Sequence, residues 1–228
     1  MKDEPGTRSP NPHGQSPAGR AVGLTGNDMR WRVLLVALTC AALIGVASFL
    51  IFGLRLVAIS GDGDDRLMGT RRSDTKFGGP GVDLMVGRAG EDHLYGGADA
   101  DGLFGSAGDD SLDTGGVGGT ANGGRGEDQL YGGYGLDRLD GAADDDWISG
   151  ASGDDRLEGG RGDDTLKGEG GDDSLFGESG HDTMIGGDGD DFIYAIDGNP
   201  DETVDCGPGD NDIAYADEGD EVVNCEIN

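Results

Sequence analysis

The chain has 228 residues, of which 48 are glycine, while only 34% are hydrophobic and 6% aromatic. A conventional thick hydrophobic core cannot be built from this composition. Residues 60–228 carry ten Lys/Arg and 43 Asp/Glu, whereas residues 1–59 carry six and three. An acidic body with net charge −33 repels nucleic acid and anionic lipid, so its expected partners are cations.

The first predicted element is an apolar helix near the N-terminus. Residues 33–54, VLLVALTCAALIGVASFLIFGL, are twenty-two residues without a charge, which is long enough to cross a membrane. Arg30 and Arg32 precede this segment. Basic residues mark the cytoplasmic side, so residues 1–32 are predicted to be a disordered cytoplasmic tail and the acidic body to be exported.

Apart from a buried helix of a globular domain, which nothing nearby in the sequence could bury, the fate of this apolar segment has two open alternatives. A retained signal anchor would hold the body at the membrane with its C-terminus outside. A signal peptide would instead be removed after Ser60, because Ala58 and Ser60 place small residues at the two cleavage-site positions. Translation from Met29 would give a conventional charged signal start and omit the preceding tail. Both alternatives predict a secreted or cell-surface protein.

From Ser60 to Tyr194 the chain divides into fifteen consecutive nonapeptides without insertion or deletion. Glycine dominates positions one and four. Position eight is apolar in every repeat except the second, which has Lys76, and position six is aspartate in every repeat except the seventh, which has Gly119. The aspartates are Asp65, Asp74, Asp83, Asp92, Asp101, Asp110, Asp128, Asp137, Asp146, Asp155, Asp164, Asp173, Asp182 and Asp191. Such constant spacing is typical of a solenoid.

Each nonapeptide predicts one short strand and one glycine turn. Positions seven to nine form the strand, whose middle side chain faces one way and whose outer two face the other. One repeat buries a single apolar side chain, so the repeats must stack to be stable. Two repeats make one coil, and successive strands then alternate between two parallel sheets. The sequence therefore predicts an all-β parallel β-roll of seven and a half coils over residues 60–194.

Burial of one leucine per repeat does not offset the cost of ordering nine residues. Aspartates eighteen residues apart lie one strand spacing apart, roughly 5 Å, and repel each other. A divalent cation between them would remove that repulsion and could also use the turn carbonyls as ligands. Oxygen ligands without histidine or cysteine favour calcium over zinc or copper.

Three repeats carry a family resemblance: GGRGEDQLY (Gly123–Tyr131), GGRGDDTLK (Gly159–Lys167) and GGDGDDFIY (Gly186–Tyr194). They closely resemble the RTX, or haemolysin-type, calcium-binding nonapeptide. The resemblance implies a roll that folds only with calcium, with each ion held between coils by two position-six aspartates and turn carbonyls. It carries the ligand role to all fourteen aspartates and implies up to about eleven complete sites, because Gly119 removes a carboxylate from two of thirteen junctions.

Two repeats depart from the pattern. The repeat Gly69–Phe77 has Lys76 in the core position, which weakens the case for Asp74 as a ligand. The repeat Thr114–Asn122 lacks the aspartate, so the local stability of the roll is expected to be lowest there.

After Tyr194 the nonapeptide spacing ends, and residues 195–228 are predicted to form a small C-terminal cap over the open sheet edge. Cys206 and Cys225 lie in this exported part. Disulfides persist outside the cell, so these two cysteines are predicted to pair.

The sequence lacks a nucleophile motif, a phosphate loop and an HExxH zinc motif, so no enzymatic activity is expected. The predicted function is calcium ion binding by a secreted or surface module, with the membrane as a further partner through residues 33–54 if they are not cleaved. The alternative is an adhesin-like or glycan-binding protein that uses outward-facing position-nine side chains. These include Met68, Val86 and Phe104 on one sheet and Phe77 and Tyr95 on the other.

Overall fold

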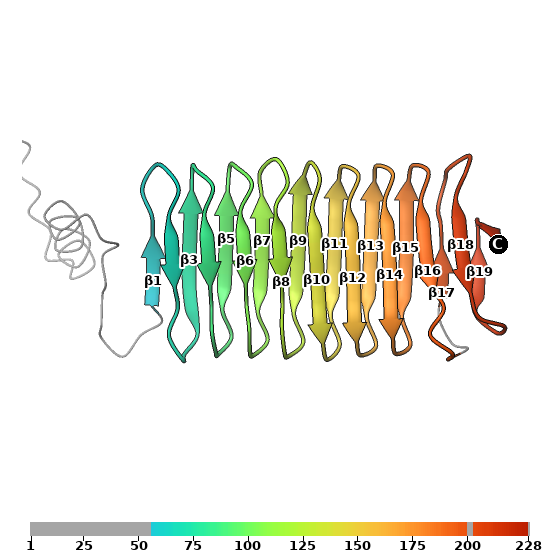
Figure 1. The fold of residues 1–228 in the computed structure, drawn as a ribbon, viewed down its shortest axis with the longest axis horizontal. Helices are drawn as coiled ribbons and strands as arrows, with labels where there is room; N and C mark the ends of the chain where they lie inside the picture. The colour runs from blue at the N-terminus through green and yellow to red at the C-terminus, as the bar shows by residue number, and fades with distance from the viewer. Residues whose placement is uncertain (1–55, 200–202, 228) are drawn as a thin grey trace, which may run out of the picture.

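The computed structural model describes residues 56–199 and 203–227. Twenty strands form two parallel ten-stranded sheets that run side by side along the molecule (Figure 1). Sheet A contains β1 (Leu56–Ile59), β3 (Asp74–Gly79), β5 (His93–Gly97), β7 (Ser111–Gly115), β9 (Gln129–Tyr134), β11 (Trp147–Ser152), β13 (Thr165–Gly170), β15 (Thr183–Asp188), β17 (Thr203–Asp205) and β19 (Glu221–Val223). Sheet B contains β2 (Arg66–Met68), β4 (Leu84–Val86), β6 (Gly102–Phe104), β8 (Thr120–Asn122), β10 (Arg138–Ala143), β12 (Arg156–Arg161), β14 (Ser174–Ser179), β16 (Phe192–Ala195), β18 (Ile213–Ala216) and β20 (Glu226–Ile227).

The chain passes from one sheet to the other with every repeat, as predicted. Each strand therefore pairs with the strand two places later, and Leu94 lies beside Leu112 in the sheet A register. The all-β parallel solenoid of two sheets is confirmed. The predicted apolar helix over residues 33–54 lies outside the described residues, and within them no helix is long and apolar enough to span a membrane.

The solenoid extends beyond the fifteen repeats at both ends. β1 precedes the first repeat and pairs with β3, although Leu56 stands where a repeat would have aspartate. β17 to β20 follow the last repeat and continue both sheets, so the segment predicted as a separate cap adds further turns of the same solenoid. Open strand edges expose unpaired N–H and C=O groups, which an adjacent extended segment can satisfy without keeping the repeat spacing.

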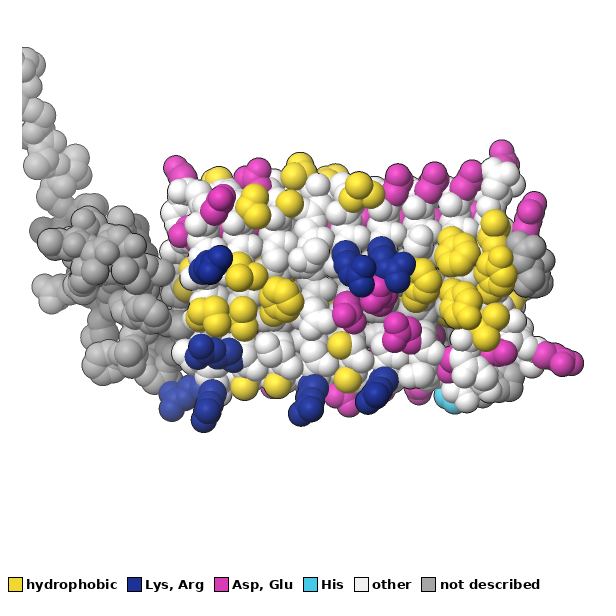
Figure 2. Space-filling model, in the orientation of Figure 1, with side chains coloured by type: hydrophobic (Ala, Val, Ile, Leu, Met, Phe, Trp, Pro, Cys, Tyr) yellow, Lys and Arg dark blue, Asp and Glu magenta, His cyan; other side chains and the backbone are white. Residues whose placement is uncertain are grey.

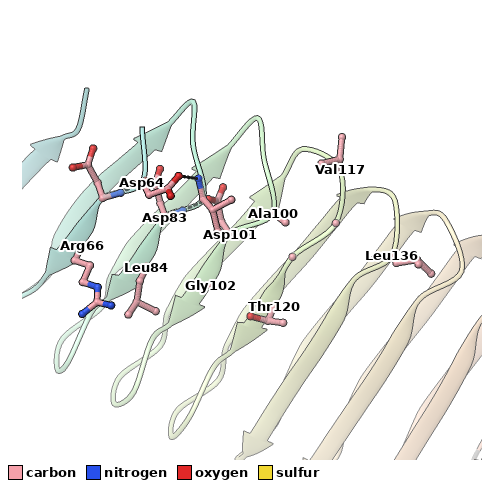
Figure 3. A pocket seen from close by; sticks show the side chains of 14 residues that line it. Asp64, Arg66, Asp83, Leu84, Ala100, Asp101, Gly102, Val117, Thr120 and Leu136 are labelled. Atoms are coloured by element: carbon pink, nitrogen blue, oxygen red, sulfur yellow. Dashed lines mark hydrogen bonds between the residues drawn. The ribbon is translucent and has the colours of Figure 1, made fainter. Parts of the chain in front are cut away.

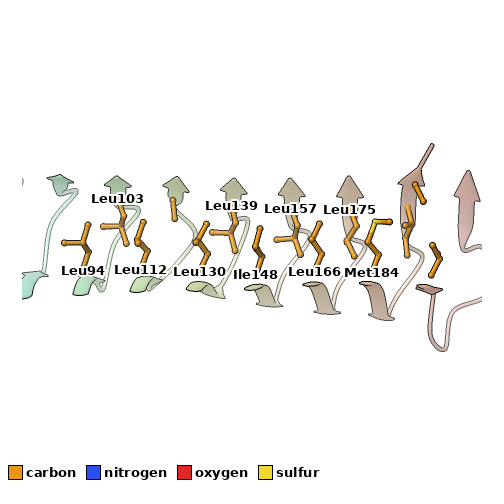
Figure 4. Close-up of a cluster of buried hydrophobic side chains, with 14 of the residues drawn as sticks. Leu94, Leu103, Leu112, Leu130, Leu139, Ile148, Leu157, Leu166, Leu175 and Met184 are labelled. Atoms are coloured by element: carbon orange, nitrogen blue, oxygen red, sulfur yellow. The ribbon is translucent and has the colours of Figure 1, made fainter. Parts of the chain in front are cut away.

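A single column of apolar side chains fills the space between the sheets (Figure 4). It consists of the position-eight residues, which are fully buried from Met85 to Ile193 except for Ala121, which is 3% exposed. In β12 the burial pattern places Leu157 and Gly159 inside, next to the buried Asp155 that precedes the strand. Each repeat therefore directs an aspartate, an apolar residue and the next glycine into the interior.

The predicted disulfide between Cys206 and Cys225 is present, with a Cα–Cα distance of 5.3 Å. It joins the residue after β17 to the residue before β20, and so ties together the last turns of the solenoid. Closing a loop of this size contributes about 3 kcal/mol by the chain-entropy account.

Candidate metal centre

The position-six aspartates lie at the start of the strands in two rows, one along each edge of the solenoid, and all of them except the half-buried Asp65 are buried. Within each row, Oδ1 of an aspartate accepts a hydrogen bond from the backbone N–H of the aspartate one coil earlier. The Asp155 N–H, for example, donates to Asp173 at 2.7 Å. Eleven such bonds join the predicted pairs at 2.6–2.9 Å.

The two rows follow the two sheets. The row entering sheet B contains Asp65, Asp83, Asp101, Asp137, Asp155, Asp173 and Asp191. The row entering sheet A contains Asp74, Asp92, Asp110, Asp128, Asp146, Asp164 and Asp182. The structure thus brings all fourteen predicted residues into two rows, and Gly119 interrupts the first. Figure 3 shows Asp83 and Asp101 of this row on neighbouring coils.

Within the described part of the chain, the second carboxylate oxygen, Oδ2, is buried without a hydrogen-bond partner in ten of these aspartates. They are Asp83, Asp101, Asp110, Asp128, Asp137, Asp146, Asp155, Asp164, Asp173 and Asp191. An uncompensated buried carboxylate costs several kcal/mol. A cation between the coils would compensate this charge at every position.

The position-one glycines provide the space beside these oxygens. A Cβ atom added at Gly159 would lie 2.5 Å from Asp164 Oδ2 and 2.9 Å from the carbonyl oxygen of Gly177 in the next coil. This space, here called a cradle, is therefore bounded by a carboxylate oxygen and a backbone carbonyl, and the cradles at Gly141 and Gly168 are bounded in the same way. No group of three His, Cys, Asp or Glu side chains gathers within the described ranges, so backbone carbonyls would have to supply the remaining ligands of a bound ion. Hard oxygen donors of this kind fit calcium.

Burial raises the pKa of many row carboxyl groups well above the ordinary aspartate range, namely those of Asp101, Asp110, Asp128, Asp146, Asp155, Asp164, Asp173, Asp182 and Asp191. The pKa of Asp146 rises to about 8 and that of Asp155 to about 7, because burial disfavours the anion and neighbouring carboxylates in the row add repulsion. The hydrogen bond from the preceding coil opposes these effects in both cases. The rows are thus poorly suited to hold bare negative charge at neutral pH.

A family model for the RTX calcium-binding nonapeptide repeat matches residues 59–75, 77–112, 114–148, 122–157, 149–184 and 176–199. The chain belongs to this RTX family. No curated protein and no solved structure matches the chain. Aspartate rows between stacked coils are typical of calcium binding by RTX repeats.

The RTX row on sheet B continues past the last nonapeptide to a residue that the sequence reasoning missed. The Asp191 N–H donates to Asp212 Oδ1 at 2.8 Å, and Asp212 is buried at the start of β18. Asp212 follows Asp191 by 21 residues, so a coil length of eighteen residues predicts the wrong position for this aspartate. The available signal was local, because Asp212 precedes the buried Ala214 by two residues, which is the spacing between positions six and eight of the RTX repeat.

Asp74 differs from the other RTX aspartates, in line with the departure noted in its repeat. Lys76 is fully buried in the core column, and its Nζ lies 3.5 Å from Asp74 Oδ2. The Thr70 backbone N–H donates to the same oxygen at 2.6 Å. Asp74 therefore has partners within its own repeat.

Proposed function

We propose that this RTX protein binds calcium ions between the coils of its roll and folds as it binds them. The observation that carries the proposal is the set of ten buried Oδ2 atoms that have no hydrogen-bond partner among the described residues and lie in the glycine-lined rows. Each ion would compensate the carboxylates of two successive coils. The ions would be held by Asp212 and by the predicted aspartates other than Asp74, whose Oδ2 already has partners in its own repeat. Up to about ten of the eleven predicted pairs would then form complete sites.

A matched pair of aspartate variants tests this proposal. Asp155 is buried and hydrogen-bonded to both Asp137 and Asp173, whereas its neighbour Asp154 is exposed. Asp155→Ala should raise the calcium concentration at the folding midpoint, measured by circular dichroism of the full chain. Asp154→Ala removes the same charge and should leave the midpoint nearly unchanged. Equal midpoints for both variants would contradict the assignment of position-six aspartates as ligands.

We further propose that the roll is a non-enzymatic module that works outside the cell, secreted or anchored through residues 33–54. Three observations support this location: the net charge of −33 on residues 60–228, the charge-free run at 33–54 and the Cys206–Cys225 disulfide. Disulfides persist in oxidising compartments. Extracellular calcium also matches the weak affinity, about 10⁻⁴–10⁻³ M, of extracellular calcium modules.

A second candidate function, glycan binding, is favoured by an aromatic cluster on the outer face of sheet B. Phe176, Phe192, Tyr194 and Tyr215 have neighbouring ring centroids 5.8–6.4 Å apart, and the Arg156 guanidinium lies 4.0 Å from the Phe176 ring centroid. Figure 2 shows an apolar cluster over the C-terminal strands of this face. Exposed aromatic rings offer flat apolar faces that suit sugar rings.

Four of the outward side chains predicted from the sequence are exposed and Val86 is half-buried. Phe77 and Tyr95 stack on each other with centroids 4.9 Å apart. A pull-down of cell-surface material with calcium present, using Tyr194→Ala and Phe77→Ala, separates the two surfaces. Loss of capture with Tyr194→Ala alone would favour the C-terminal cluster. Capture unchanged by either variant would contradict the second candidate.

A further inference from the structure

We infer that two junctions of the roll are closed by the chain's own groups and take no calcium ion. The groups are the Lys76 ammonium at the Asp74 cradle and the Thr114 side chain at the cradle of the seventh repeat, where Gly119 replaces the aspartate. This inference rests on the proposed calcium binding and identifies two junctions of the roll that bind no ion.

At the first of these junctions, a positive charge already lies beside the carboxylate. Lys76 occupies the core column between Ala58 and Leu94, where its side chain has no exposed surface. Its Nζ lies 3.5 Å from Asp74 Oδ2 and has no other hydrogen-bond partner in the described part of the chain. A buried ammonium is stable only beside an anion, so it competes with any second cation for Asp74.

Asp74 also lacks the unsatisfied oxygen that marks the regular sites. Its Oδ2 accepts the Thr70 N–H at 2.6 Å, and its Oδ1 lies 3.3 Å from the Thr70 hydroxyl. Groups of the same repeat therefore bind the carboxylate oxygens that face an ion in the regular cradles. An added calcium ion would face the lysine charge and would have to displace these bonds.

At the second junction, the usual residues of positions one and six are exchanged. Regular repeats place glycine first and aspartate sixth, and the glycine leaves room for the carboxylate. The repeat Thr114–Asn122 has Thr114 first and Gly119 sixth. A Cβ at Gly119 would lie only 2.9 Å from Thr114 Cβ and 3.2 Å from Thr114 Cγ2. The threonine side chain therefore fills the space that an aspartate would need.

The Thr114 hydroxyl makes the contacts that an ion would make. Thr114 is fully buried, and its Oγ1 donates to the Gly132 carbonyl and lies 2.8 Å from Asp137 Oδ1. These groups are the position-one carbonyl and the position-six carboxylate of the next coil. Ser60, which also has a hydroxyl at position one, likewise donates to the next position-one carbonyl, that of Gly78. A hydroxyl at this position donates to the next position-one carbonyl, whereas glycine has no side chain that could do so.

Variants that restore the regular residues should create calcium sites, which equilibrium dialysis of the full chain against labelled calcium counts directly. Lys76→Leu should bind one more ion than the wild type. Lys167→Leu is the matched control, because Lys167 lies on the outer face near the Trp147 ring and should leave the number unchanged.

The exchanged pair has its own test by the same measurement. Thr114→Gly combined with Gly119→Asp should bind at least one more ion than the wild type, whereas Thr114→Gly alone supplies no carboxylate and should bind no more. A wild-type chain that binds calcium while Lys76→Leu and the double variant bind the same number would overturn this inference alone. A wild-type chain that binds no calcium would overturn the proposed function and this inference with it.

Discussion

At the scale of single residues, the roll depends on the absence of a side chain at position one. Gly168→Ala would bring a Cβ into overlap with Asp173 Oδ2 and within 2.6 Å of the Gly186 carbonyl oxygen. We expect this variant to lose about 1–3 kcal/mol of stability in calcium, as overpacked cores do. Gly170→Ala in the same strand is the control, because its Cβ would meet only the Ala151 carbonyl oxygen at 3.9 Å. Equal denaturation midpoints for the two variants would show that the space beside Asp173 can hold an additional methyl group.

The raised pKa values of the row aspartates predict a pH response of the calcium-free chain. Burial raises the pKa of Asp146 to about 8, of Asp164 to about 7 and of Asp191 to about 6. The folded form therefore binds more protons than the unfolded form between about pH 4 and 8, so the free energy of unfolding falls as pH rises through this window. Without calcium, β structure measured by circular dichroism should increase from pH 8 to pH 5. A spectrum that does not change over this range would contradict the buried state of the rows.

Among the strands, β8 should be the weakest paired element in the centre of the roll. It has three residues, and the coil before it lacks the aspartate pair, because Gly119 offers no carboxylate to Asp101. In the calcium-loaded protein we expect faster amide hydrogen exchange in β8 than in β10 or β12, which have six residues each. Uniform protection across the three strands would show that carboxylate ligation does not limit local stability.

Most elements could be predicted from the sequence, because the eighteen-residue coil determines which strands pair and which side chains face the interior. The exceptions have physical reasons. β1 escaped prediction because Leu56 replaces the aspartate, and Asp212 because the preceding coil is longer than eighteen residues. The filling of the seventh cradle by Thr114 could not be predicted, because the repeat pattern alone does not show that positions one and six are in contact.

At the scale of the whole molecule, the charge distribution and the disulfide predict exposure outside the cell. Protease added to intact cells should degrade or release the roll, whether it is anchored or secreted, while a cytoplasmic marker stays intact. Complete protection of the roll in intact cells would contradict both versions of the export proposal.

The central claim is that calcium, bound along the aspartate rows, completes a core too thin to fold the acidic body by itself. Each ion would join two coils and preorganise the next site, so folding should be cooperative. Circular dichroism of the full chain near pH 7.5 during a calcium titration tests this most directly. The account predicts a largely disordered spectrum of the body in excess chelator and a cooperative gain of β signal at about 10⁻⁴–10⁻³ M calcium. A full β spectrum in excess chelator would contradict it.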